Sequence, residues 1–386
     1  MVTKTTDAYV RGTPLEVAVG WIYGLLPHSP LPRTNRTPRE ALDDAMRPAL
    51  LGAPCYVTFS GGRDSSAVLA AATSLARREG HELPIPVTLA YPGLRDTDET
   101  AWQRLVIDHL KLPEWIVARQ PEQSDLLGEA ARESLLARGV MWPAAIHTHG
   151  PLYGQLSPGS LMTGEGGDAT LGLRRGTALT VLRHGRRPSR ALLTTAAREL
   201  LPRRARDWLL RRDQPVGLHD RWLRAAALAE HERRMSEDIV AEPLRYDEGT
   251  WFISRRRAFA TLVHNQAAHA TAYGLAPFDP LLDHGFLAAL ARSGGRWGYN
   301  GRTATMQALF ADVLPRAVIA RSTKASFNHA YRGSGTIEFA RDWDGSGVDT
   351  DLVDAERLRE VWLSDEPTMA TALLLHSAWL ASQGTP

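Results

Sequence analysis

The feature that most constrains this chain is a run of small and polar residues between an apolar strand and a helix. Residues 55–59 (CYVTF) have the composition of a buried strand, and residues 65–78 (SSAVLAAATSLARR) that of a helix. The run between them, residues 60–66 (SGGRDSS), contains two glycines that let backbone N–H groups approach a phosphate closely. The helix start adds the positive end of its dipole. A phosphate-binding loop is therefore predicted, although the GxxxxGK[ST] pattern of other phosphate loops is absent.

Each residue of this loop has an expected role. The serine hydroxyls can donate to phosphate oxygens, and the glycines supply backbone N–H groups. Asp64 would repel a phosphate unless a cation lies between them, so we predict that it is a Mg²⁺ ligand. The residues expected at the phosphate are Ser60, Gly61, Gly62, Asp64, Ser65 and Ser66.

Charge and cysteine content exclude several other classes of protein. The sequence has 45 Lys and Arg residues against 43 Asp and Glu, a formal net charge of +2, which argues against a DNA-binding or membrane-surface protein. Cys55 is the one cysteine, so neither an intrachain disulfide nor a thiolate metal cluster can form. The first residues lack the apolar run of a signal peptide, and no stretch reaches the roughly 18 apolar residues of a membrane span. We expect a cytoplasmic protein.

Strand-like and helix-like segments alternate after the loop. Residues 85–91 (IPVTLAY), 115–118 and 160–163 (SLMT) have strand composition, with helical patterns between them. This alternation predicts an α/β fold in which a parallel, doubly wound sheet carries helices on both faces.

The chain length suggests more than one structural unit. We predict an N-terminal helical segment (1–50), an α/β core (51–175) and a helix-rich part that completes the substrate site (176–386). Residues 174–213 contain twelve Arg and three acids. This Arg-rich segment is interpreted either as solvated helix faces or as a dock for an acidic peptide, a phosphate-rich ligand or tRNA.

A second motif, residues 161–168 (LMTGEGGD), follows another short apolar strand. The carboxyl ends of the strands in a doubly wound sheet share one edge, so this loop can meet the first over a single ligand. Asp168 is expected to complete the Mg²⁺ site with Asp64, and Glu165 is a candidate general base.

Further short signals follow in the C-terminal half: residues 280–283 (PLLD), 314–315 (LP) and 321–324 (RSTK). Taken separately, the first is a turn into a helix capped by Asp283, and the last is a surface basic pair. In this order, however, the motifs resemble the synthetase domain of the asparagine synthase family, within the ATP pyrophosphatase superfamily. SGGRDSS resembles its pyrophosphate loop, TGEGGD its GEGxD segment, and the later signals its C-terminal pattern. The resemblance covers residues 57–327.

The resemblance implies a HUP-like fold, ATP and Mg²⁺ as cofactors, and a two-step reaction. A substrate carboxylate attacks the α-phosphate of ATP, which gives an acyl-adenylate and pyrophosphate, and an amine then displaces AMP to form an amide. Lys324 matches the family lysine that stabilises charge during the attack. The family positions that contact adenine fall on Thr58, Leu89, Thr163 and Gly164.

The chain departs from glutamine-dependent members of the family. Val2 follows Met1 where those enzymes carry a cysteine, so we expect no glutaminase domain, with the amine supplied as ammonia, by the substrate or by a partner. No glutamate of an LExR pattern precedes Pro280, and Arg302 lies near a family lysine. These changes resemble lasso peptide cyclases, in which an Asp or Glu side chain is the acid and the N-terminus of the peptide is the amine. That resemblance implies a ribosomal precursor peptide as substrate and a partner protein that delivers it.

Other interpretations remain open. An ammonia-dependent asparagine synthetase-like enzyme would use the same motifs, and so would a β-lactam synthetase-like enzyme, although the latter carries tyrosine at the position of Glu165. A tRNA-modifying thiolase could use the loop with the Arg-rich segment, and a non-catalytic ATP-binding protein could retain the motifs. His147 and His149 could share one face of a strand as metal ligands, but without further ligands a structural or substrate-pocket role is favoured.

Overall fold

The structure is a computed structural model of the chain. It describes residues 9–92, 94, 97–119, 124–185, 188–213, 221–323, 325, 327–365 and 368–384.

Five parallel strands form one sheet in the order β3-β2-β1-β4-β5. The strands are β1 (Cys55–Thr58), β2 (Ile85–Ala90), β3 (Ile116–Arg119), β4 (Gly159–Met162) and β5 (Leu275–Phe278). The order runs outward in both directions from the neighbours β1 and β4. This arrangement confirms the predicted α/β fold with a parallel, doubly wound sheet, and it places the topological switch point between these two strands.

The fifth strand lies outside the segments to which the sequence analysis assigned strands, in the part expected to be helix-rich. The structure pairs Pro277 with Leu161 of β4. A proline is tolerated here because β5 lies at the edge of the sheet, where its missing N–H leaves no central ladder bond unmade.

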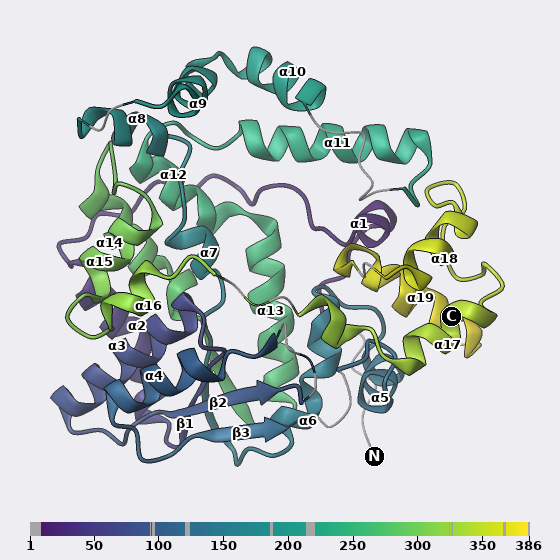
Figure 1. The fold of residues 1–386 in the computed structure, drawn as a ribbon, viewed down its shortest axis with the longest axis horizontal. Coiled ribbons are helices and arrows are strands. Elements are labelled where there is room, and N and C mark those ends of the chain that lie inside the picture. Colours follow the sequence, from purple (N-terminus) through teal and green to yellow (C-terminus); the bar gives the residue numbers. More distant parts are fainter. Residues whose placement is uncertain are drawn as a thin grey trace.

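Helices surround the sheet (Figure 1). The α-helices up to Val240 are α1 (Pro14–Val19), α2 (Pro38–Leu51), α3 (Arg63–Glu79), α4 (Thr100–Leu110), α5 (Glu129–Arg138), α6 (Gly150–Tyr153), α7 (Gly167–Thr170), α8 (Thr177–Arg183), α9 (Arg190–Leu200), α10 (Arg203–Asp213) and α11 (Ala225–Val240). Those that follow are α12 (Tyr246–Phe252), α13 (Arg257–Thr271), α14 (His284–Gly294), α15 (Arg302–Phe310), α16 (Arg316–Ala320), α17 (Ser334–Asp342), α18 (Ala355–Leu363) and α19 (Ala372–Ser382).

Successive residues of β1 bury their side chains on opposite faces of the sheet, as the pleat requires. Val57 belongs to the cluster that packs against α2, α3 and α14, whereas Tyr56 belongs to the cluster that contains Leu152 of α6 and Ala270 of α13. Helix α3 packs into the same cluster through small side chains, since Ala67, Ala70, Ala71 and Ala72 are fully buried. Both faces of the sheet are therefore covered.

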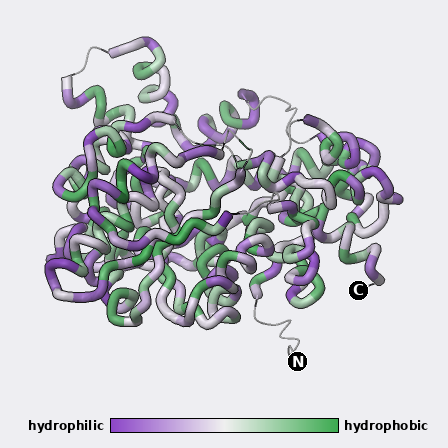
Figure 2. Tube along the Cα trace, turned by 60° about the horizontal axis from the view of Figure 1, so that its bottom comes forward, coloured by the Kyte–Doolittle hydropathy of each residue, from purple (hydrophilic) through white to green (hydrophobic). Residues whose placement is uncertain are grey.

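A second apolar cluster lies beside the sheet, on the right of Figure 1. It joins residues from both ends of the chain, such as Leu15 of α1 and Leu374 of α19, around the fully buried Trp222. Helices α8, α9, α10 and α11 extend over the top of the molecule as an arm (Figure 1). In Figure 2 the central segments of the trace are hydrophobic, while many peripheral turns are hydrophilic. No helix among the described residues has both the length and the apolar character that a membrane crossing requires.

Candidate active site

The two glycine-containing loops that the sequence singles out meet at the carboxyl ends of β1 and β4. A Cβ atom at Gly164 would lie 2.8 Å from the backbone nitrogen of Ser65, and one at Gly167 would lie 2.3 Å from Cγ of Asp64. Only glycine allows this approach, because real Cβ atoms do not come so near to other heavy atoms. The loop contact that we predicted from the shared sheet edge is therefore present.

The first loop is held by hydrogen bonds between its own residues. The hydroxyls of Ser60 and Ser65 lie 3.1 Å apart, and the backbone N–H of Gly62 donates to Ser60 Oγ over 3.2 Å. Gly61 adopts a φ of 82°, a left-handed conformation that favours glycine. Ser66 is fully buried on α3, and its hydroxyl has no partner among the described residues, so its predicted contact with phosphate stays a prediction.

The loop is anchored from outside by Arg321, a residue of the RSTK signal. Its guanidinium donates to the Gly61 carbonyl over 2.9 Å and to the Glu99 carboxylate over 2.5 Å, and it lies 4.8 Å from the centre of the Trp102 ring. Both charged side chains are less than a tenth exposed. Sequence analysis did not foresee this pair, because its members lie on segments far apart in the chain.

The two predicted metal ligands, Asp64 and Asp168, are linked by Arg302 from the first turn of α15. Nη2 of Arg302 donates to both oxygens of Asp64, over 2.6 and 2.7 Å, and Nη1 donates to Asp168. Burial raises the pKa of the Asp64 carboxyl, and the nearby guanidinium opposes that shift. The structure thus brings the two acids together around Arg302. In the sequence, Arg302 was noted only because it departs from the family pattern.

Glu165 lies at the accessible surface of the second loop, with its backbone N–H donating to Thr163 Oγ1 over 3.1 Å. The hydroxyl of Thr163 in turn donates to the carboxylate of Asp279. Desolvation by the neighbouring protein, together with the charge of Asp279, raises the pKa of the Glu165 carboxyl to about 7, against a hydrogen bond from Gln266. Sequence analysis missed Asp279, although an acid directly before Pro280 was a signal that could have found it.

The four predicted adenine contacts gather at the same edge of the sheet. Thr58 ends β1, Leu89 lies near the end of β2, and Thr163 and Gly164 follow β4. Thr58 Oγ1 lies 3.5 Å from the Met162 carbonyl, which joins the ends of β1 and β4. These positions are thus side by side, while their contact with adenine stays a prediction.

Lys324 lies outside the described residues. The residues just before it are placed: Arg321 Nε donates to Thr323 Oγ1 over 3.1 Å, and the same arginine contacts the phosphate loop. Asp283 caps α14 as expected, its carboxylate accepting from the Phe286 N–H over 3.0 Å. The PLLD and RSTK segments therefore lie beside the two glycine-containing loops.

With this geometry established, we compared the chain with known proteins. The sequence profile of the asparagine synthase family matches residues 37–381. The chain belongs to the asparagine synthase family. No curated protein matches it in a sequence comparison. The matched region includes all five strands, both glycine-containing loops and the RSTK segment, so the fold is of the ATP pyrophosphatase type. Membership in the asparagine synthase family supports an ATP-dependent carbon–nitrogen ligase activity.

Among the described residues, no group of three or more His, Cys, Asp or Glu side chains is arranged to hold a metal. Asp64 and Asp168 nevertheless fit Mg²⁺, which typically takes one or two carboxylates and completes its shell with substrate phosphates and water. The fact that both acids bind one guanidinium indicates that they can share a cation.

His147 and His149 do not lie on a strand, contrary to one interpretation of their spacing. They lie within and just after a short 3₁₀ helix, Ala144–Thr148. Burial lowers the pKa of both imidazoles, so they remain neutral, and His147 Nδ1 lies 2.9 Å from Ser134 Oγ. Both are structural residues of the core rather than a metal site.

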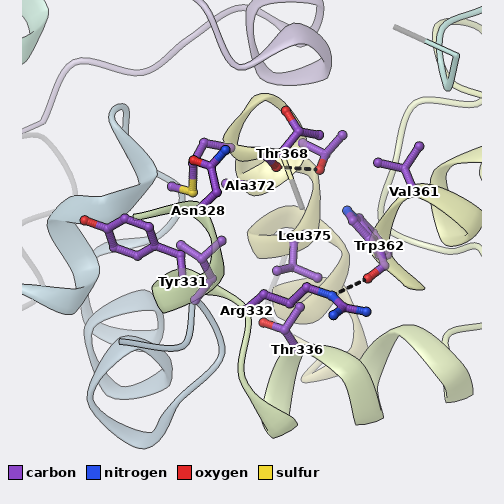
Figure 3. A pocket seen from close by; sticks show the side chains of 12 residues that line it. Asn328, Tyr331, Arg332, Thr336, Val361, Trp362, Thr368, Ala372 and Leu375 are labelled. Atoms are coloured by element: carbon purple, nitrogen blue, oxygen red, sulfur yellow. Dashed lines mark hydrogen bonds between the residues drawn. The ribbon is translucent and has the colours of Figure 1, made fainter. Parts of the chain in front are cut away.

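A small cavity lies between α17, α18 and α19 and the turn around Tyr331 (Figure 3). Arg332 closes one side by donating from Nε to the Trp362 carbonyl over 3.1 Å. Its volume of about 30 Å³ has room for about one or two water molecules but for no substrate.

Among the described residues, five of the twelve arginines of the Arg-rich segment form ion pairs within the protein. Ion pairs join Arg175 to Glu199, Arg198 to Asp213 and Arg211 to Asp207. The pair between Arg198 and Asp213 links the neighbouring helices α9 and α10 of the arm, while the role of the segment stays a prediction.

Proposed function

We propose that this chain is an AMP-forming amide ligase that adenylates a substrate carboxylate, releases pyrophosphate and transfers the acyl group to an amine. The observation that carries the proposal is the meeting of the two loops at the switch point, where Asp64, Asp168 and Glu165 gather beside a helix N-terminus. Ligands of open α/β sheets bind at such a point. The family membership supplies the reaction class.

The loop residues would act on the triphosphate. The N–H groups of Gly61 and Gly62 and the start of α3 provide partial positive charge at the departing pyrophosphate, and the hydroxyls of Ser60 and Ser65 can exchange their mutual hydrogen bond for one to an oxygen. When bound, Mg²⁺ would neutralise developing charge on the phosphates, held by Asp64 and Asp168. Lys324 would stabilise the α-phosphate as the carboxylate attacks it.

The second step needs a base for the incoming amine, and Glu165 is suited to it. A carboxyl with a pKa of about 7 is largely ionised slightly above neutral pH and can accept a proton from the amine nitrogen. Thr163 fixes the backbone of Glu165 and the carboxylate of Asp279 through one hydroxyl. Two acids near that hydroxyl also favour a substrate amine that arrives as a cation.

For the substrate, we propose an Asp or Glu side chain and the N-terminal amine of a ribosomal precursor peptide, joined as a lasso peptide macrolactam and delivered by a partner protein. Glu165 supports this over a β-lactam synthetase-like reaction. A tRNA thiolase is disfavoured by Cys55, because it is buried and burial raises the pKa of its thiol to about 12. Use of ATP is consistent with the cytoplasmic location expected from the sequence.

Phosphorus NMR of the enzyme with Mg-ATP and a panel of carboxylates and amines tests the proposal. We expect AMP and pyrophosphate to appear with a linear peptide that carries an internal Asp or Glu and a free N-terminus. The same peptide with an acetylated N-terminus is the matched control for amide formation. Turnover with aspartate and ammonia instead would identify an asparagine synthetase-like enzyme. Formation of ADP and phosphate would contradict attack at the α-phosphate.

Glu165→Gln is expected to slow amide formation roughly 100-fold while changing pyrophosphate release much less, because the amide cannot accept the proton of the amine. In the wild type, the rate of amide formation should rise with pH through about 7, since the ionised form of Glu165 is the active one. Single-turnover kinetics of both steps from pH 5.5 to 8.5 give the measurement. Equal losses in the two steps, or a variant that keeps the wild-type pH profile, would contradict a base role for Glu165.

A further inference from the structure

A single guanidinium occupies the space between the two acids of the candidate metal site. Arg302 Nη2 contacts both oxygens of Asp64, and Nη1 contacts Asp168. The side chain of Asp64 is 18% exposed and that of Asp168 is 58% exposed. The inner acid is therefore fully engaged by arginine, while the outer one is open to solvent.

Asp64 and Asp168 contact the same guanidinium, and their negative charges repel each other strongly because protein screens charges less than water does. A positive charge between them is therefore needed. Arg302 supplies that charge from the first turn of α15, directly after Gly301. This segment lies far along the chain from either acid. Its buried Nε has no hydrogen-bond partner among the described residues. The two acids thus provide the hydrogen bonds that the structure gives to this guanidinium.

We infer that Arg302 is an internal counter-ion that competes with a divalent cation for Asp64 and Asp168. The inference rests on the proposed function for the identity of the metal site. A cation that takes an oxygen of Asp64 would lie beside the positive charge of Nη2, which contacts both oxygens, and the repulsion between the two charges favours release of the guanidinium. The metal alone therefore binds weakly, and the phosphates of a nucleotide supply the additional ligands that drive Arg302 away.

This competition gives Arg302 a definite role in the order of binding. Without nucleotide, Arg302 holds the carboxylates of Asp64 and Asp168 to one guanidinium. When metal and nucleotide bind together, the guanidinium is released from the two acids. The phosphates of the nucleotide bring additional negative charge to the same position. A variant that lacks Arg302 should therefore bind metal more tightly when no nucleotide is present. Loss of a metal ligand or of a structural residue would instead weaken the binding of metal.

Mn²⁺ serves as the probe, with its affinity measured by electron paramagnetic resonance titration of the nucleotide-free protein. We expect Arg302→Gln to bind Mn²⁺ about tenfold tighter than the wild type. Its thermal unfolding midpoint should fall in EDTA and recover when Mn²⁺ is added, whereas the wild-type midpoint should hardly respond to the metal. Equal affinities in variant and wild type would overturn the inference.

Arg63→Gln is the matched control. Arg63 lies on the first turn of α3, close enough to Asp64 and Asp168 to interact with both charges, and no hydrogen bond joins it to either acid. Its removal changes the local charge equally but frees no cation position, so we expect at most a twofold gain in affinity. A gain equal to that of Arg302→Gln would reduce the effect to general electrostatics and overturn the inference.

A second variant keeps the test decisive if Arg302→Gln does not fold. Arg302→Lys retains the charge but loses the fork that reaches both acids, and it should bind Mn²⁺ about threefold tighter than the wild type. Wild-type affinity in this variant would contradict the inference. Because the titration contains no ATP, its outcome is separate from pyrophosphate release, whose absence in the wild type would overturn the proposed function alone.

Discussion

Asp64→Asn is expected to lower the rate of pyrophosphate release by about 10²–10³-fold. The carboxylate lies at the start of α3, against Gly167 of the second loop. If no metal were held there, a phosphate group would face the negative charge of Asp168 directly. Asparagine has the same shape, so the contact with Gly167 survives while the charge is lost. The measurement is a coupled pyrophosphate assay at saturating Mg-ATP, together with thermal unfolding to show that the fold is retained.

Asp312→Asn is a suitable control for that change. Asp312 is 70% exposed and forms a 3.5 Å ion pair with Arg39, away from both loops. We expect wild-type turnover from it. A turnover of Asp64→Asn within threefold of the wild type would contradict the assignment of Asp64 to the phosphate and metal site.

Arg321→Leu is expected to destabilise the protein by about 3–5 kcal/mol, because it leaves the carboxylate of Glu99 buried without its partner. It also removes the hydrogen bond that holds the Gly61 carbonyl, so the phosphate loop loses its anchor. Chemical denaturation measures the free energy of unfolding, and the pyrophosphate assay measures the effect on the loop.

The double variant Arg321→Leu with Glu99→Leu separates the two effects. Removing both charges should restore much of the stability, since apolar replacement of a buried ion pair is often tolerated. Pyrophosphate release should remain low, because Gly61 still lacks its donor. Arg47→Leu, which breaks an exposed pair with Glu79, should change the stability far less. An Arg321→Leu protein as stable and active as the wild type would contradict the anchoring role.

The parts of the site that the sequence predicted are those that short segments determine by themselves. Residues 60–66 link a short apolar strand to an alanine-rich helix and include the first turn of that helix, so strand, loop and helix follow from local composition. The shared edge of a parallel sheet then places Gly164 and Gly167 near the first loop without any knowledge of side-chain contacts.

The parts that could not be predicted depend on pairs of distant residues. Arg302 reaches Asp64 across 238 positions, and Arg321 reaches Glu99 across 222. Sequence patterns report periodicity within a segment, and they contain no information about which charged side chain will face which. The raised pKa of Glu165 also depends on its surroundings: desolvation and the charge of Asp279 raise it, and a hydrogen bond from Gln266 opposes the shift. Strand β5 was missed for a simpler reason, since proline is uncommon within strands and Pro277 is accommodated at the edge of the sheet.

The way β4 and β5 are connected has a consequence for how such enzymes diversify. The two strands are adjacent and hydrogen-bonded, yet the arm of α8, α9, α10 and α11 is inserted between them in the sequence. Because the chain leaves and re-enters the sheet at neighbouring strands, the length and composition of the arm can change without altering the order of the strands. The arm can thus be exchanged as a module while the sheet and its glycine-containing loops are retained.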